Sequence, residues 1–76
     1  MTLWELSKGR EASVSHLHQH LDASVNTRLL EMGFESNQYI KCLRRSPFSG
    51  PIVIQLGDCV YSLEQQLAEQ ILISNQ

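Results

Sequence analysis

The sequence has little of what marks several specialised classes of protein. Its 76 residues include only two cysteines, too few for the disulfide framework of a small secreted domain. The four glycines are scattered, so they form no glycine-rich phosphate-binding loop. No apolar run approaches the ~20 residues that cross a bilayer. The opening residues lack the basic start and apolar stretch of a signal peptide, so we expect a cytoplasmic protein without direct membrane insertion.

Charge of either sign is also sparse. The chain has six lysine and arginine residues and eight acidic residues, which gives a net charge of −2. Proteins that bind nucleic acid through general electrostatics need clustered positive charge to neutralise phosphates. We therefore expect no nucleic-acid partner, and the acidic balance disfavours an RNA-binding role.

The short chain limits the functions that the protein can perform. Residues 1–76 fit a single domain. A chain of this size buries only about 60% of its unfolded surface, which leaves little room for a deep catalytic pocket. No Ser-His-Asp or Cys-His arrangement has a recognisable context. We therefore expect neither an enzyme nor a bound cofactor.

Short apolar segments separated by turn residues predict a mainly β protein. The expected strands cover residues 11–17, 39–44, 52–56, 59–63 and 71–73. A helix is expected at 23–32, with helical turns at 3–6 and 64–69 and a frayed end at 74–76. This pattern indicates a small β-barrel whose one helix lies between the first and second strands and plugs an open end.

The helix has an apolar stripe and signals at both of its ends. The stripe repeats with helical spacing at Val25, Leu29 and Met32. Asp22 is expected to cap the first turn, because its carboxylate can accept an orphan backbone N–H. Gly33 falls where a helix ends in the left-handed conformation, and Phe34 should then pack back onto Leu29.

Alternation of apolar and polar residues predicts which side chains are buried. The expected core holds Val14, Leu29, Ile40, Ile54, Leu63 and Ile71. The alternation fails at residues 43–45, which predicts a bulge. Cys42 and Cys59 fall in separate strands and match no zinc motif. We interpret both as small buried apolar residues without a disulfide.

Three histidines form the most conspicuous candidate site. His16, His18 and His20 alternate, so in a strand their imidazoles would point to one side and could converge on a metal ion. No nearby cysteine or carboxylate cluster completes a ligand shell. We expect solvated loop histidines rather than a metal site, and keep metal binding as the alternative.

A local basic group lies at the end of the expected second strand. Lys41, Arg44 and Arg45 precede Pro47 and Phe48. These residues suit the solvated face of a strand. They also suit a binding surface, because a phenylalanine beside arginines is typical of interface anchors.

The order of these segments resembles the FeoA family of ferrous iron transport proteins. The resemblance rests on Arg28-Leu-Leu-Glu-Met-Gly-Phe34, on Ile40-Lys-Cys-Leu-Arg-Arg-Ser-Pro-Phe-Ser-Gly-Pro-Ile52, and on a closing segment with Tyr61-Ser-Leu63 and Ile71-Leu-Ile73. The chain departs from the family pattern at three places. It has Ser36-Asn37 where many members have Pro-Gly, and Ser49-Gly50-Pro51 where many have Gly-Asp-Pro. It has Glu64 where a basic residue is common.

The resemblance implies an SH3-like β-barrel similar to the C-terminal domain of diphtheria-toxin-type iron repressors. It also implies a cytoplasmic accessory protein of the FeoB permease, acting by protein–protein interaction with its cytoplasmic side or its GTP-binding domain. We place the partner-binding residues at Arg28, Arg44, Arg45 and Phe48. The alternative is a stand-alone metal-binding or metal-sensing domain that uses His16, His18 and His20. Self-association stays open.

Overall fold

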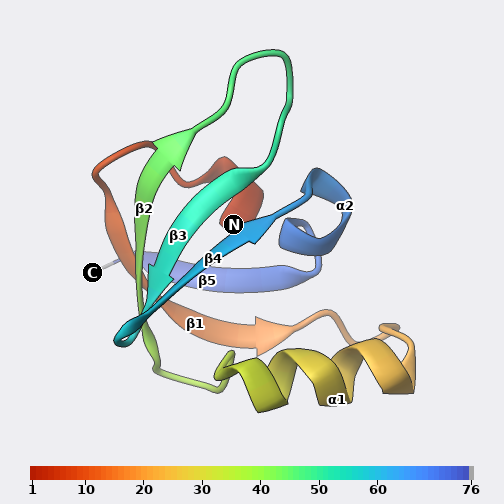
Figure 1. Ribbon diagram of the computed structural model, residues 1–76. Helices are drawn as coiled ribbons and strands as arrows, with labels where there is room; N and C mark the ends of the chain where they lie inside the picture. The colour runs from red at the N-terminus through yellow and green to blue at the C-terminus, as the bar shows by residue number, and fades with distance from the viewer. Residues whose placement is uncertain (76) are drawn as a thin grey trace.

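Five antiparallel strands and one longer helix make up the computed structural model, which describes residues 1–75 (Figure 1). The strands are β1 (Glu11–Leu17), β2 (Tyr39–Arg45), β3 (Ile52–Leu56), β4 (Cys59–Leu63) and β5 (Ile71–Asn75). The helical segments are the 3-10 turn η1 (Leu3–Glu5), α1 (Ala23–Met32) and the short α2 (Gln65–Ala68). The expected mainly β fold is confirmed, and no helix of residues 1–75 is long and apolar enough to cross a membrane.

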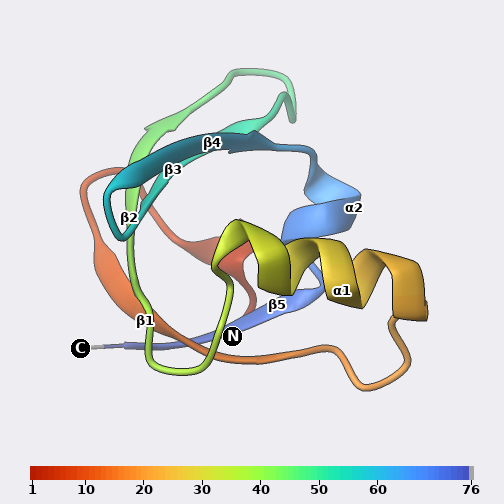
Figure 2. The same ribbon diagram turned by 60° about the horizontal axis from the view of Figure 1, so that its bottom comes forward.

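The strands form one curved sheet in the order β4-β3-β2-β1-β5. The sheet does not close, because β4 and β5 are its two edges and do not pair with each other. The helix α1 connects β1 to β2 and crosses the open side between those edges (Figure 2). The predicted barrel is therefore an open, SH3-like sheet, with α1 between β1 and β2 in the chain, as predicted.

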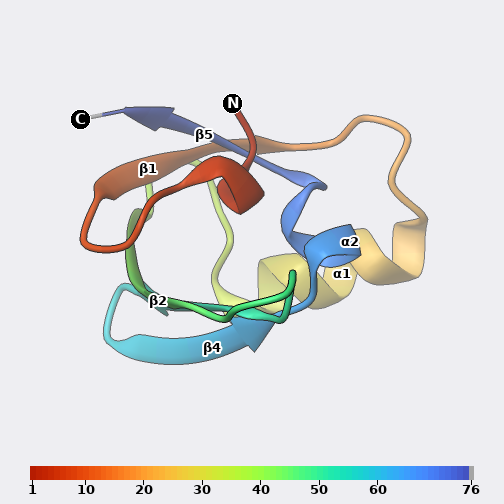
Figure 3. The same cartoon turned by 90° about the horizontal axis from the view of Figure 1, so that it is seen from above.

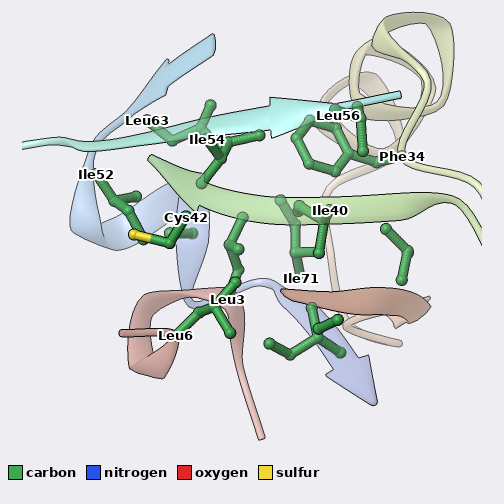
Figure 4. Close-up of a cluster of buried hydrophobic side chains, with 14 of the residues drawn as sticks. Leu3, Leu6, Phe34, Ile40, Cys42, Ile52, Ile54, Leu56, Leu63 and Ile71 are labelled. Atoms are coloured by element: carbon green, nitrogen blue, oxygen red, sulfur yellow. The ribbon is translucent and has the colours of Figure 1, made fainter. Parts of the chain in front are cut away.

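Alternating apolar residues of the strands point into one core (Figure 4). All six residues of the predicted core are buried. The core also takes in Leu3 and Leu6 from the N-terminal turn and Phe34 after α1. The N-terminal turn therefore packs against the core through Leu3 and Leu6.

The C-terminal end of α1 has the predicted glycine stop. Gly33 is left-handed with φ of 112°, a conformation that costs a side-chain-bearing residue more than glycine. The N–H of Gly33 donates to Leu30 O, and that of Phe34 donates to Leu29 O, both at 3.0 Å. This is the bond pattern of a Schellman motif.

The N-terminal end of α1 differs from the prediction. Asp22 occupies the cap position, but its side chain makes no cap hydrogen bond. Its carboxylate instead accepts a hydrogen bond of 2.8 Å from Ser24 Oγ. The predicted side-chain capping interaction is therefore wrong.

Strand β5 runs further than expected. Ser74 and Asn75 pair with Ser13 and Ala12 of β1, so the predicted frayed end is wrong for these two residues. Gln76 lies outside the described residues. The N-terminus adds to this edge, because Ile73 N donates to Met1 O at 2.9 Å.

The predicted bulge in β2 is confirmed by a register shift between Cys42 and Arg44. A second shift, between Val14 and His16 of β1, was not predicted. Both cysteines are free, as expected, and Cys42 is buried. The expectation that Cys59 is buried is wrong, because it begins the edge strand β4 and is exposed.

Candidate functional site

The loop between β2 and β3 holds Phe48 entirely in solvent. Its side chain is 101% exposed, more than any other large apolar residue described. Phe48 and Ser49 both have positive φ, 59° and 61°, a conformation that costs on the order of 1–3 kcal/mol per non-glycine residue. A Cβ added at Gly50 would lie 2.8 Å from Ser46 Cβ, so the tight loop requires glycine there. The loop thus presents the phenylalanine outward on a constrained backbone.

Arg45 fixes the base of this loop to the N-terminal turn. Its Nη1 donates hydrogen bonds to the carbonyl oxygens of Trp4 and, at 3.2 Å, of Leu6. Its guanidinium carbon lies 4.5 Å from the centroid of the Trp4 ring, a cation–π contact. Arg45 is half-buried by these contacts, so much of its hydrogen-bonding capacity is used within the chain.

Arg44 carries the exposed charge beside the loop. It pairs with Val53 in the β2–β3 ladder, whereas Arg45 pairs with Ile52. Successive residues of a strand point to opposite faces, so Arg44 points away from the face that Arg45 uses. Arg44 and Phe48 are therefore two predicted partner-binding residues whose side chains are exposed. They lie four positions apart in the sequence.

Arg28 belongs to a different surface. It lines a groove of about 610 Å³ between α1 and the segment formed by β4 and α2. Val25, Met32, Leu63 and Leu67 give this groove apolar walls. Figure 1 shows α1 and the β2–β3 loop at opposite ends of the molecule. The structure therefore does not bring Arg28 together with the other three predicted residues.

The three histidines lie at and after the end of β1. Because the strand ends at Leu17, they do not share one strand face as the metal-binding interpretation requires. His16 Nδ1 lies 2.9 Å from Ser15 Oγ, and His18 Nδ1 accepts the backbone N–H of His20 at 3.2 Å. Among residues 1–75, no group of three or more His, Cys, Asp or Glu side chains is placed to hold a metal ion.

The Cys42 thiol and the Tyr61 phenol are both held in their protonated forms. Burial raises the pKa of the Cys42 thiol, which favours its protonated form. Burial also raises the pKa of Tyr61, and its hydroxyl donates to Met32 O at 3.0 Å. Tyr61 therefore ties β4 to the C-terminal end of α1.

Two features of these surfaces were missed by the sequence analysis. One is the attachment of Arg45 to Trp4, which joins residues separated by 41 positions. The other is the groove, where Arg28 was the one lining residue predicted to bind a partner. The available signal for the groove was the spacing of Val25 and Arg28. They are three positions apart, so they lie on the same face of α1.

The family model for the FeoA domain matches residues 1–75. The FeoA of Stenotrophomonas maltophilia, solved in complex with zinc, is 25% identical, with a TM-score of 0.85 over 97% of this chain and 89% of that one. The FeoA protein of Chlorobium tepidum is 27% identical, with a TM-score of 0.87 over 99% of this chain and 70% of that one.

A manganese-dependent transcriptional repressor shares the fold alone, at 18% identity and a TM-score of 0.88, over 100% of this chain and 41% of the repressor. No curated protein matches the sequence significantly. The family match spans nearly the whole chain, and the same fold recurs in solved FeoA structures. The chain therefore belongs to the FeoA domain family, whose members are small accessory proteins of ferrous iron transport.

Proposed function

We propose that the chain is a cytoplasmic accessory protein of ferrous iron uptake, which acts by binding the FeoB permease or its GTP-binding domain. Membership of the FeoA family supports the role in iron uptake. The proposed mode of action is a protein contact rather than catalysis. It is supported by the exposed Phe48 and Arg44 side chains on a small fold that buries no polar or charged residue among those described.

The exposure of Phe48 is the observation that carries this proposal. A phenylalanine held in water forgoes the roughly 1.5–3 kcal/mol that burial of such a side chain contributes. A partner that covers the ring recovers this free energy. The loop backbone is constrained at Gly50, and Arg45 fixes its base, so little conformational entropy is lost on binding. Arg44 lies close enough in sequence to add an electrostatic contact.

Titration of the chain against the cytoplasmic region of the permease, with and without a nucleotide, tests the proposal. Phe48→Ala should weaken binding on the order of thirtyfold, because a buried aromatic anchor carries about 2 kcal/mol or more. Leu30→Ala is the matched control, since Leu30 is also an exposed apolar residue, at 46%, but lies on α1. Equal binding by the parent and Phe48→Ala would assign the contact to another surface.

A further inference from the structure

We propose that the outer edge of β4 receives an extended, basic segment of a partner protein as an added β-strand. The partner would contribute backbone hydrogen bonds to the edge and cationic side chains to its two ends. This inference is independent of the permease proposal, because it concerns another surface and can be tested with a synthetic peptide.

The register of the β3–β4 hairpin defines which backbone groups face outward. Leu56 pairs with Cys59 across the turn at Gly57 and Asp58, and Ile54 pairs with Tyr61. In an antiparallel ladder the residues alternate between bonding to the neighbouring strand and pointing away from it. Gly57 N donates to Tyr39 O of β2, so residues 55 and 57 bond toward β2 while residues 54 and 56 bond toward β4.

The outward groups of β4 are therefore the N–H and C=O of Val60 and Ser62. Both residues are exposed, with 60% of the Val60 side chain in solvent. No backbone hydrogen bond from a turn or loop of residues 1–75 reaches either residue. Figure 3 shows β4 along the rim of the molecule when it is seen from above. No backbone hydrogen bond of the described residues has to break for this edge to pair with a further strand.

The other sheet edge is protected, in contrast to β4. Thr2 forms a β-bridge with Leu72 of β5. Ile73 N, also in β5, donates to Met1 O. The N-terminal residues thus cover part of the β5 edge, as folded proteins commonly do with strand edges. Nothing equivalent covers β4 within the part of the chain that the structure describes.

The charges that flank β4 select the occupant. Asp58 precedes the strand and Glu64 follows it, and both are exposed. If a second copy paired with Val60 opposite Ser62, each Asp58 would face the other copy's Glu64. Like charges directly opposite destabilise a strand pair, so a second copy is disfavoured in this register. A segment with lysine or arginine at both ends would meet a carboxylate at each.

The groove beside β4 favours apolar residues between those cations. Tyr61 and Leu63 share one face of β4, and Leu63 lines the groove with Met32 of α1. In an added antiparallel strand, the alternate side chains on that face lie next to Tyr61 and Leu63. The fitting segment therefore alternates apolar and polar residues between two basic ends.

A peptide titration followed by amide NMR on the full chain tests this proposal. The probe is the capped peptide Lys-Val-Thr-Val-Thr-Val-Lys, and the control is the same peptide with glutamate at both ends. We expect Kd on the order of 1 mM for the basic peptide, with the largest shifts at the Val60 and Ser62 amides. The acidic peptide should bind at least tenfold more weakly. Equal binding of both peptides, or shifts centred elsewhere, would overturn the proposal.

Two variants make the test specific for the edge. Ser62→Pro removes an outward N–H that the β3–β4 ladder does not use, so proline is tolerated there and binding should be lost. Ser62→Thr keeps the N–H and should bind like the parent. If Ser62→Pro fails to fold, the double change Asp58→Lys, Glu64→Lys at exposed positions provides the test. This variant should bind the glutamate-ended peptide more tightly than the lysine-ended one. An unchanged preference, or dimerisation of the parent through β4, refutes the assignment of a basic partner.

Discussion

Neighbouring arginines of β2 have different roles, although the sequence presents them as one basic group. Arg45 donates to two carbonyl oxygens of the N-terminal turn and stacks on Trp4. Arg44 is exposed. The sequence could predict the bulge that sets their orientation, but not the segment that Arg45 contacts, because that contact spans about half the chain.

Arg45→Ala should therefore destabilise the fold, whereas Arg44→Ala should not. Loss of hydrogen bonds from a charged group and of a cation–π contact predicts a cost of about 2–3 kcal/mol for Arg45→Ala. Exposed charge substitutions usually change stability by less than about 0.5 kcal/mol, which is the expectation for Arg44→Ala. Urea denaturation of both variants measures the difference. Equal stabilities would show that the Arg45 contacts contribute nothing net.

Arg44 should affect binding instead of stability. In the permease titration, Arg44→Ala should weaken binding at low salt and lose most of that effect at high salt, because exposed charges are screened within about 10 Å at 0.1 M. The effect of Phe48→Ala should persist at high salt, since burial of an aromatic ring is not electrostatic. An Arg44 effect that is independent of salt would indicate a desolvated contact rather than a rim charge.

The histidines give a third prediction at this scale. The chain, purified without an affinity tag, should hold no zinc or ferrous iron after washing with a chelator. Tight structural sites need four well-placed ligands, and the His16 and His18 Nδ1 atoms lie within hydrogen-bonding distance of groups of the chain itself. Metal analysis checks this, with the triple change His16→Ala, His18→Ala, His20→Ala as the control. One equivalent of metal retained by the parent and lost in the variant would favour the metal-binding alternative.

At the scale of elements, local patterns predicted α1, β1, β3 and β4 with the bounds that the structure shows. The helix was predictable because its apolar stripe and glycine stop are both local signals. The extent of β5 was not, because Ser74 and Asn75 are polar residues whose strand conformation comes from pairing with β1. The exposure of Cys59 depends on the order of strands in the sheet, which no local pattern reports.

The neighbouring leucines of α1 test the predicted orientation of this helix. Leu29 is 1% exposed, and Leu30 is 46% exposed. Leu29→Ala should cost about 2–5 kcal/mol, because it removes buried methyl groups and leaves a cavity. Leu30→Ala, the same chemical change on the solvent side, should cost less than about 0.5 kcal/mol. Thermal or urea denaturation of the pair distinguishes them, and a loss below about 0.5 kcal/mol for Leu29→Ala would show that the helix contributes little to the core.

At the scale of the whole molecule, the two cysteines report on different parts of the fold. Cys59 is exposed at the start of an edge strand, whereas Cys42 is fully buried in the central strand β2. A thiol reagent should modify Cys59 in the folded protein. Cys42 should react only when the sheet opens, because its thiol has no contact with solvent and burial raises its pKa.

The labelling rate of Cys42 should therefore follow the free energy of unfolding. When opening is fast relative to labelling, the rate depends on the equilibrium population of the open state. Leu29→Ala should then speed Cys42 labelling by about thirtyfold or more, the factor that corresponds to 2 kcal/mol, and leave Cys59 labelling unchanged. Labelling can be followed by mass spectrometry, with Cys59→Ser to isolate Cys42. If Leu29→Ala lowers stability but does not change the labelling rate of Cys42, β2 opens locally while α1 stays in place. The core would then consist of two units that open separately.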